Sequence, residues 1–420
     1  MQYAGGMRDT QLYARILGIE SPWKVSHVEL DLPHDEVRVH VEHDDESLTC
    51  PECGQPCPGY DKRPRRWRHL DTCQYRTVLV ADLPRVKCPE HGVKQVAAPW
   101  AEPGGRFTAL FEALVIDWLR EASIAAVSRQ LKLSWDEVDT IMKRGVNRGL
   151  QRRERQEPRH VAVDEVSQRR GHNYLTIVSD RERGCVLHVE PDRKRTSLAA
   201  FYDQLGEAGC GGIESVTMDM WGPYIAATQA QVPGAEQKIA FDKFHVAQHL
   251  GEAVDKVRRR EHRQLTAEGD DRLKGTRYHW LKHPQNVSER DWNGRFAQLR
   301  DSTLKTARAW AIKEAAMSLW EYRRRAWARK AWQRWYSWAI RSRLEAVKQV
   351  ARMVKGHMEG IVNAVVLKAT NALAESINGR IQRVKRMACG FRNTERFQRA
   401  IYFHLGDLDL HPASPTHTKP

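Results

Sequence analysis

The stretch SVTMDMWGPY, residues 215–224, decides the expected fold of the central part of the chain. Four residues suited to a buried strand lead into Asp219, and the Trp-Gly-Pro that follows breaks the pattern. Residues 160–171, HVAVDEVSQRRG, repeat the arrangement, because an apolar run leads into Asp164. The pattern predicts two buried strands that each end on a carboxylate.

Further strand-like and helical segments alternate around these two stretches. The expected order is strand, strand, strand, helix, strand, helix, strand, from HVAVDEV at 160–166 to QKIAFDKFHV at 237–246. Such an order is typical of a mixed α/β sheet. Beyond Asp242 the sequence predicts helices throughout 243–400, with a break at LKHPQN, 281–286.

The part of the chain before this region predicts two smaller modules. Residues 22–100 favour a β-rich module, because short β-like runs are separated by Pro, Gly and Cys. The expected strands are WKVSHVELDL (23–32), EVRVHVEH (36–43), RTVLVADL (76–83) and PRVKC (84–88). The pattern becomes helical from Arg106, and the charged stretch QRRERQEPRH, 151–160, is expected to be a linker.

The composition points to a polyanionic partner. The 420 residues suffice for two to four domains, and 68 Lys and Arg against 53 Asp and Glu give a net charge of +15. Nucleic acid is the first candidate for so basic a chain, and a generally basic surface that favours solubility is the alternative. We expect a cytoplasmic protein, because no signal peptide and no apolar run of membrane-spanning length is found.

Two cysteine knuckles, CPECG at 50–54 and CPEHG at 88–92, predict a metal site. Cys50, Cys53, Cys88 and His91 form a Cys₃His set with the spacing of a closed, structural zinc site. Three further residues compete for a place in this set: Cys57, Cys73 and His69. The alternative is a group of buried thiols without a metal.

Residues 124–144, IAAVSRQLKLSWDEVDTIMKR, predict a helix-turn-helix. Ser134 is positioned to cap the second helix, with Glu137 completing a capping box. The apolar seam is expected to comprise Ile124, Val127, Leu131, Val138 and Ile141. The candidate phosphate contacts on the second helix are Lys143, Arg144 and Arg148. Such a two-helix corner also occurs in proteins that do not bind DNA.

The two strand-end carboxylates predict a second metal site. If their strands are neighbours, Asp164 and Asp219 converge and offer oxygen ligands for divalent metal. A site that cleaves phosphodiesters needs a third carboxylate, and Glu375 in TNALAESINGRIQRVKR, 370–386, is one candidate. Asp242 at the end of the last expected strand is the other.

The residues around these carboxylates bear on whether the carboxylates bind metal or cap helices. Asn371 and Asn378 share a helix face with Glu375, whereas Glu165 alternates to the other face of its strand and is not an expected ligand. The alternative is that Asp219 and Asp242 are helix N-caps, since Asp is favoured at that position.

The chain resembles, in order along the sequence, the ISL3 family of bacterial insertion-sequence transposases. The catalytic motifs that carry the resemblance are VAVDEVS (161–167), TMDMWGPY (217–224), FDKFHV (241–246) and ATNALAESINGRIQRVKRMACGFRN (369–393). The N-terminal motifs CPECG, WRHLD (67–71), RVKCPEHG (85–92) and PWAEPGGRFTALFE (99–112) extend it over nearly the whole chain.

The resemblance implies a fold and a set of domains. These are an α/β RNase H-like catalytic domain with a large all-helical insertion, preceded by a β-rich zinc-binding module and a helix-turn-helix. The implied boundaries are 1–100 for the zinc module, 106–150 for the helix-turn-helix, 151–160 for the linker, 161–265 and 365–405 for the catalytic domain, 266–364 for the insertion and 406–420 for a tail.

The resemblance also implies a DDE triad formed by Asp164, Asp219 and Glu375, which would hold Mg²⁺ or Mn²⁺. Asp242 and His245 match the family's D-x-F-H element. Near-site support is expected from Asp242, His245, Asn371, Asn378 and Trp221, and the zinc set falls on Cys50, Cys53, Cys88 and His91.

The implied activity is metal-dependent DNA transposition. The family binds terminal inverted repeats in double-stranded DNA, releases a 3′-hydroxyl and transfers it to target DNA, as a homodimer or higher oligomer. It does so in the bacterial cytoplasm at the nucleoid, without a membrane partner. Two rivals differ in class: a DNA-binding regulator with an inactive catalytic domain, and a metal-dependent nuclease without strand transfer.

The expected insertion holds much of the positive charge. From 301 to 360 there are 14 Lys and Arg against 5 Asp and Glu, a difference of +9. The same stretch holds Trp310, Trp320, Trp327, Trp332, Trp335 and Trp338, which we expect mainly in the core, with base stacking as the alternative. YRRRAWARKAWQRW, 322–335, presents cations between them as a face for DNA. Near the expected site, Arg383, Lys385 and Arg386 add further DNA contacts.

Overall fold

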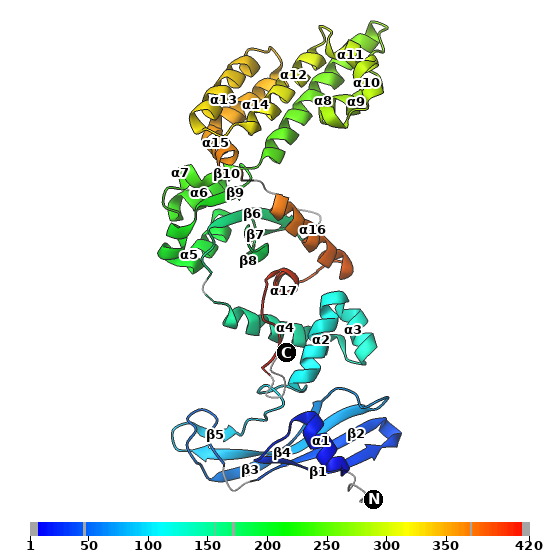
Figure 1. Ribbon diagram of the computed structural model, residues 1–420, viewed down its shortest axis with the longest axis vertical. Coiled ribbons are helices and arrows are strands. Elements are labelled where there is room, and N and C mark those ends of the chain that lie inside the picture. Colours follow the sequence, from blue (N-terminus) through cyan, green and yellow to red (C-terminus); the bar gives the residue numbers. More distant parts are fainter. Residues whose placement is uncertain (1–6, 45–47, 155, 170–172, 370–371, 414–420) are drawn as a thin grey trace, which may run out of the picture. The chain divides into compact units, whose positions relative to one another are not determined.

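The computed structural model describes residues 7–44, 48–154, 156–169, 173–369 and 372–413 (Figure 1). The chain forms two compact units. The first comprises Met1–Arg153 together with Leu408–Pro420, and the second comprises Glu154–Asp407. The division between Arg153 and Glu154 falls within the stretch 151–160.

The first unit begins with the short helix α1 (Asp9–Leu17) and a sheet in the order β1-β2-β4-β3. The strands are β1 (Trp23–Asp31), β2 (Glu36–His43), β3 (Gly59–Arg68) and β4 (Arg76–Cys88), and β5 (Gly92–Gln95) pairs with β4. Three tryptophans lie in its core, where Trp100 makes edge contacts with Trp23 and Trp67 at ring distances of 4.9 and 5.4 Å.

Two expectations for this sheet are corrected. The segments 76–83 and 84–88 form one continuous strand, β4, which runs through Pro84. β3 was not expected, because its sequence GYDKRPRRWR is charged and contains Pro64. β3 lies at the end of the path β1-β2-β4-β3, and edge strands tolerate both charges and proline.

Three helices complete the first unit: α2 (Ala109–Glu121), α3 (Ile124–Leu131) and α4 (Trp135–Arg152). The C-terminal segment from Leu408 packs on α4, where two glycines give it room. A Cβ added at Gly149 would lie 2.7 Å from the Leu408 Cβ, and one at Gly145 would lie 3.3 Å from the Leu410 carbonyl oxygen. The backbone of residues 408–410 therefore contacts the helix directly.

The second unit contains a five-stranded mixed sheet in the order β10-β9-β6-β7-β8. Its strands are β6 (His160–Ser167), β7 (Tyr174–Asp180), β8 (Cys185–Pro191), β9 (Ser215–Met218) and β10 (Ile239–Phe241). β6, β7 and β8 are antiparallel, whereas β9 runs parallel to both β6 and β10. The expected order of strands and helices is confirmed, and the short helix α7 (Ala235–Lys238) is an addition.

Helices cover both faces of this sheet (Figure 1). On one face, Val161, Val163 and Val178 pack with α5 (Arg195–Gly212) and α6 (Gly222–Gln231). On the other face, Val166, Leu175 and Ile177 pack with α16 (Ala372–Met387) and α17 (Thr394–Leu405). The sheet is thus the middle layer of three, and α16 returns to it from a distant part of the sequence.

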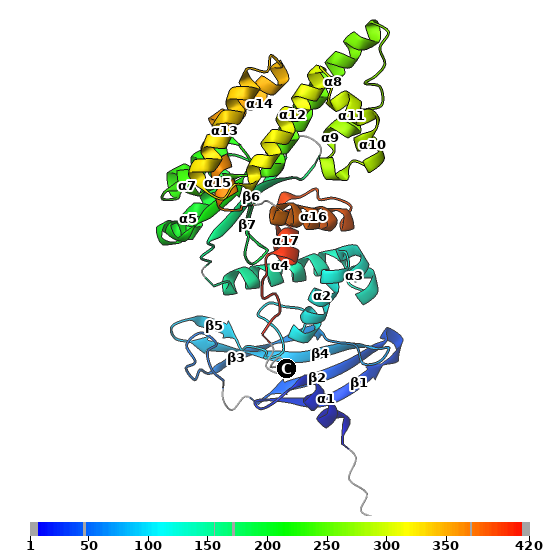
Figure 2. The same ribbon diagram turned by 45° about the horizontal axis from the view of Figure 1, so that its top comes forward.

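The stretch between β10 and α16 is helical in its described residues, as predicted. It contains α8 (Lys243–Ala267), α9 (Arg277–Leu281), η3 (Pro284–Asn286), α10 (Glu289–Asn293), α11 (Arg295–Arg300), α12 (Lys305–Ser318), η4 (Leu319–Glu321), α13 (Arg325–Ile340), α14 (Glu345–Gly356) and α15 (Met358–Val366). Figure 2 shows α12, α13 and α14 side by side. None of the helices in the described ranges has both the length and the apolar character needed to cross a membrane.

A buried asparagine ties this helical stretch to the edge of the sheet. Asn363 on α15 is fully buried and donates hydrogen bonds to the carbonyl oxygens of Glu236 and Ile239, at 2.8 and 2.6 Å. Arg325 on α13 donates to its side-chain oxygen at 2.6 Å. The carbonyl groups beside the edge strand β10 therefore have partners.

Candidate functional site

The two carboxylates found first in the sequence belong to two neighbouring strands, Asp164 within β6 and Asp219 just after β9. β6 and β9 pair in parallel with partners 55 positions apart, from His160 with Ser215 to Ala162 with Thr217. Asp164 and Asp219 each lie two residues beyond the last of these pairs, and they are close enough that, besides burial, the charge of Asp219 raises the pKa of Asp164. Asp219 follows the end of β9, as expected, whereas Asp164 lies inside β6, because β6 continues to pair with β7 as far as Ser167.

Asp164 is held in a polar network at the face of α16. One carboxylate oxygen accepts a hydrogen bond of 2.6 Å from the Asn378 side-chain nitrogen, and the other accepts one of 2.7 Å from the Glu165 backbone N–H. Burial raises the pKa of Asp164 to about 6, and the neighbouring charge of Asp219 also raises it. A bound cation would offset both effects, so the surroundings of Asp164 fit a metal ligand.

Asp219 forms an ion pair with a histidine from the next element. The Nε2 atom of His245, in the first turn of α8, lies 2.5 Å from the Asp219 Oδ1. This hydrogen bond raises the pKa of His245. His245 therefore partly neutralises and orients the Asp219 carboxylate.

The alternative that the two aspartates are helix N-caps is wrong for Asp219 and correct for Asp242. Trp221 occupies the N-cap position of α6, and no side chain caps that helix, so the alternative is wrong for Asp219. Asp242 does cap α8, because its side chain accepts a hydrogen bond of 3.2 Å from the Phe244 backbone N–H. Asp242 is also buried, which leaves it beside the site in a structural role.

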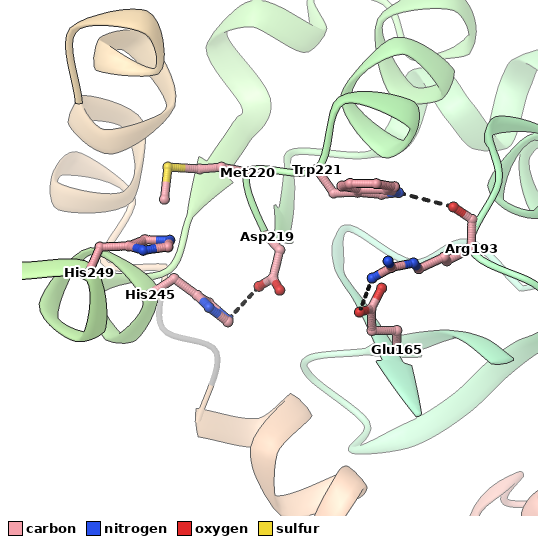
Figure 3. Close-up of a pocket in the computed structure, with 7 residues that line it drawn as sticks. All are labelled: Glu165, Arg193, Asp219, Met220, Trp221, His245 and His249. Carbon is pink, nitrogen blue, oxygen red and sulfur yellow. Dashed lines mark hydrogen bonds and ion pairs between the residues drawn. The ribbon is translucent and has the colours of Figure 1, made fainter. Parts of the chain in front are cut away.

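An open cleft of about 190 Å³ lies beside Asp219 (Figure 3). Its lining residues are Glu165, Arg193, Asp219, Met220, Trp221, His245 and His249. Glu165 was expected on the opposite face of β6 from Asp164. In the structure, Glu165 lines the cleft beside Asp219, and its carboxylate forms an ion pair of 2.9 Å with Arg193. Glu165 is thus already paired with a cation.

Arg193 forms a stack with two aromatic rings at the cleft. Its guanidinium carbon lies 4.5 Å from the centre of the Tyr174 ring and 4.7 Å from that of Trp221. The Trp221 indole N–H donates a hydrogen bond of 3.0 Å to the Arg193 carbonyl oxygen, and 37 % of the residue stays exposed. The indole is therefore held rigidly at the rim of the cleft (Figure 3).

Two ionisable residues of the cleft, His249 and Arg193, were missed from the sequence, as was Met220. His249 lies four positions after His245 on α8, and this spacing puts both on one helix face. That signal was present in the sequence. Arg193 follows β8 in a charged loop, and nothing local distinguishes it from Lys194 or Arg195.

The third candidate carboxylate, Glu375, is exposed in the first turn of α16. Asn378 lies three positions later and contacts Asp164, so Glu375 lies one turn along the helix from that contact. The other expected supporting residue, Asn371, lies outside the described residues. Carboxylate oxygens are the ligands that Mg²⁺ and Mn²⁺ prefer. Within the described ranges, the zinc set is the group of three or more metal-ligating side chains whose ligand atoms lie within 4.8 Å of one another, and Asp164, Asp219 and Glu375 do not form such a group.

The expected DNA contacts on α16 differ in their surroundings. Arg383 and Arg386 are exposed, at eight and eleven positions after Glu375, and so continue its helix face. Lys385 instead donates a hydrogen bond of 2.8 Å to the Ser167 carbonyl oxygen at the end of β6. Lys385 therefore also fixes α16 to the sheet.

The zinc set is brought together in the first unit. One ligand atom from each of Cys50, Cys53, Cys88 and His91 lies within 4.8 Å of the other three. Cys57 is buried against the same cluster but is not in the set, and Cys73 is exposed. His69 lies elsewhere, since its Nδ1 is hydrogen-bonded to the Thr108 hydroxyl at 2.8 Å. The four atoms fit a closed tetrahedral site.

The helix-turn-helix has its predicted capping box. The Ser134 backbone N–H donates to the Glu137 carboxylate at 2.9 Å, and the Glu137 N–H donates to the Ser134 hydroxyl at 3.2 Å. Val127, Val138 and Ile141 are fully buried between the helices, as expected. Lys143 is exposed on α4 and remains a candidate phosphate contact.

The expected phosphate contacts of Arg144 and Arg148 are corrected. Arg148 is 7 % exposed and forms ion pairs with Glu102 and Glu112 at 2.6 and 3.1 Å, and it also donates to the Leu410 carbonyl oxygen. Arg144 pairs with the same two carboxylates at 2.9 and 3.3 Å. Both guanidinium groups hold α4 to the rest of the first unit, so they are not free to meet phosphates.

Comparisons with known proteins agree with this organisation. A family model described as "Transposase" matches residues 161–401, the "Helix-turn-helix domain of transposase family ISL3" matches 96–146, and the "zinc-finger of transposase IS204/IS1001/IS1096/IS1165" matches 46–91. The transposase for insertion sequence element IS1001 of Bordetella parapertussis is 30 % identical over 355 residues, 83 % of this chain and 87 % of that protein. The transposase for insertion sequence element IS1557 of Mycobacterium tuberculosis is 30 % identical over 421 residues, 93 % of this chain and 94 % of that protein.

Proposed function

The chain belongs to the ISL3 family of transposases, and from this premise we propose that it cuts DNA at the ends of its own insertion sequence. The released 3′-hydroxyl ends are then transferred to target DNA at the same site. The observation that supports the proposal is the parallel pairing of β6 with β9, the strands that lead to Asp164 and Asp219, together with the hydrogen bond from Asn378 of α16 to Asp164.

The catalytic domain would comprise residues 161–265 and 365–405 and have an RNase H-like fold, with residues 266–364 as its insertion. Its support is the five-stranded mixed sheet with helices on both faces. In such a sheet, side chains beyond the ends of parallel strands gather at one edge, where ligands bind. The edge beyond β9 holds Asp219.

Asp164, Asp219 and Glu375 would hold divalent metal. Bound Mg²⁺ or Mn²⁺ would supply Lewis-acid activation of a water oxygen and stabilise the oxygen that leaves. Asn378 orients the Asp164 carboxylate and His245 orients that of Asp219. Side chains that orient metal ligands in this way strongly affect metal affinity.

The two chemical steps balance without a covalent protein intermediate. In the first step, a water oxygen attacks phosphorus, the bond from phosphorus to the 3′ oxygen breaks, and this oxygen leaves as a 3′-hydroxyl. In the second step, that 3′ oxygen attacks a target phosphorus and displaces a target 3′ oxygen. Trp221 and Arg193 at the rim of the cleft, with Arg383 and Arg386 on α16, would position the strand.

Recognition of the terminal inverted repeats would belong to the first unit. The zinc module and the helix-turn-helix match family models for these parts of transposases. Lys143 on α4 would contact phosphate. Pairing of two ends would require a dimer or a higher oligomer, which sedimentation with and without end DNA would detect.

The test is strand cleavage on DNA that carries the element's own ends, in Mg²⁺, for the wild type and Asp219→Asn. We expect a 3′-hydroxyl nick at the element boundary, lost in Asp219→Asn while end binding persists. Asp291→Asn is the matched control, because Asp291 is also paired with a histidine, His279 at 3.5 Å, but lies far along the chain from the candidate ligands.

Two outcomes would overturn the proposal. If the wild type binds the ends and does not cut them in Mg²⁺ or Mn²⁺, the protein acts as a DNA-binding regulator. If it cuts them and forms no joined products with target DNA, it acts as a nuclease.

A further inference from the structure

Helix α13 has two faces of different character. Its inner face packs into the core through Ala328, Trp332, Trp335 and Ala339, none more than 4 % exposed. Its outer face carries Trp327, Lys330, Arg334 and Trp338, followed by Arg341 just after the helix, all of them exposed. Successive members of this outer set are three, four, four and three positions apart. They therefore lie in one line along the helix, here named the α13 stripe.

The two indoles of the stripe are unusually open to solvent. Trp327 is 57 % exposed and Trp338 is 42 % exposed, whereas Trp332 and Trp335 of the same helix are buried. The expectation that the tryptophans of this region form the core is thus correct for the inner pair and wrong for the outer pair. The Lys330 ammonium lies 6.0 Å from the centre of the Trp327 ring, so cation and aromatic ring already share one surface.

The cations of the stripe have no carboxylate beside them. Among the residues that the structure describes, Lys330, Arg334 and Arg341 form no ion pair. Arg325 and Arg329, on the side of the same helix, both pair with Glu359. The Glu359 carboxylate therefore neutralises cations beside the stripe and not those within it. The positive charge of the stripe can attract a negatively charged partner.

Charge and shape together select the partner. The same stripe on a second copy of the chain would repel this one, whereas a polyanion would be attracted. A duplex would engage the cations only, because its bases are stacked inside. We propose that the α13 stripe binds a DNA strand with unpaired bases, with the cations at phosphates and the indoles stacked on bases. Trp327 and Trp338 are eleven residues apart, about 16 Å along the helix, a span of several nucleotides.

The inference does not depend on the catalytic roles of Asp164, Asp219 and Glu375. It adds a DNA-binding surface on the helical stretch between β10 and α16, outside the helix-turn-helix and outside the cleft of Figure 3. If the stripe does not bind DNA, the proposal of cleavage at the element ends still stands. If the protein does not cleave DNA, the proposal for the stripe still stands.

The test is binding of the full chain to a labelled single-stranded oligonucleotide and to a duplex of the same length, neither with element ends. Fluorescence anisotropy without added divalent metal gives both affinities. We expect Trp327→Ala with Trp338→Ala to weaken single-strand binding about tenfold or more and to change duplex binding less than about twofold. Lys330→Gln with Arg334→Gln should lower the slope of log affinity against log salt by about 1.4 for the single strand.

The matched control is Lys348→Gln with Arg352→Gln on the neighbouring helix α14. This pair removes two cations that Glu345 already neutralises, so we expect both affinities and the salt slope to stay near the wild type. Far-UV circular dichroism confirms that each variant is folded. Unchanged single-strand affinity in the folded tryptophan variant would overturn the proposal. A change in sedimentation without a change in DNA affinity would also overturn it, because the stripe would then contact a second copy of the chain.

Discussion

The side-chain nitrogen of Asn378 donates a hydrogen bond of 2.6 Å to the Asp164 carboxylate and so joins helix α16 to strand β6. The two residues are 214 positions apart in the sequence. Because Glu375 lies one turn before Asn378 on the same helix, this bond sets how close the third candidate carboxylate comes to the other two. The Asn378 side chain is therefore a positioning element for the whole site.

We expect Asn378→Ala to lower the rate of strand cleavage by about ten- to a hundredfold, the usual range for a group that orients a metal ligand. The required Mg²⁺ concentration should rise as well, because the Asp164 carboxylate loses its orientation. Cleavage rates measured across a Mg²⁺ titration check both effects. Gln382→Ala is the control, since Gln382 is exposed on the same helix and no contact to Asp164 is seen among the described residues. A wild-type Mg²⁺ dependence in Asn378→Ala would contradict the positioning role.

The zinc set makes a prediction about which cysteines matter. We expect Cys88→Ser to lose zinc and to weaken the fold of residues 48–96, because structural zinc contributes directly to folding. Cys57→Ser should retain one zinc ion per chain, although Cys57 is buried against the same cluster. Elemental analysis of each purified variant gives the ratio. Zinc loss in Cys57→Ser, with zinc retained in His91→Ala, would show that Cys57 replaces His91 as the fourth ligand.

Because His69 is buried, we expect the first unit to lose stability in weak acid. Burial lowers the pKa of His69 to about 4, from an ordinary value of 6.5. Between these values the unfolded chain binds a proton that the folded chain does not, so stability falls as the pH falls from 6.5 towards 4. The full loss corresponds to about 3 kcal/mol.

Urea unfolding at pH 7.5 and at pH 5 checks this, with the midpoint read by hydrogen exchange in peptides from residues 60–90. His69→Gln should remove most of the pH dependence, because Gln does not titrate and still offers a partner to the Thr108 hydroxyl. An equal pH dependence in His69→Gln and the wild type would assign the effect to other groups.

The sequence predicted the parts of this protein that depend on local pattern. The capping box of Ser134 and Glu137, the knuckles of the zinc set and the order of elements from β6 to β10 follow from spacing and periodicity. The sequence left open whether the strands that lead to Asp164 and Asp219 are neighbours, and the structure pairs these strands in parallel.

Long-range contacts account for what the sequence did not predict. The basic sequence around Arg148 is typical of an exposed helix. Its partners Glu102 and Leu410 are 46 and 262 positions away, so the local pattern does not indicate that Arg148 is buried. β3 lacks apolar alternation and is specified by its partner β4. Trp327 and Trp332 have the same local composition, and only the packing of α13 against its neighbours decides which of them is buried.

The most direct test of the account asks whether Asp219 holds the metal itself or only orients His245. The measurement is strand cleavage at the element ends by Asp219→Cys and Asp219→Ser, each in Mg²⁺ and in Mn²⁺. A thiolate binds Mn²⁺ better than Mg²⁺, because soft ligands disfavour the harder ion. We predict that both variants are inactive in Mg²⁺ and that Asp219→Cys alone recovers cleavage in Mn²⁺. Activity of Asp219→Ser in Mg²⁺, or equal failure of both variants in Mn²⁺ while end binding persists, would contradict direct metal binding by Asp219.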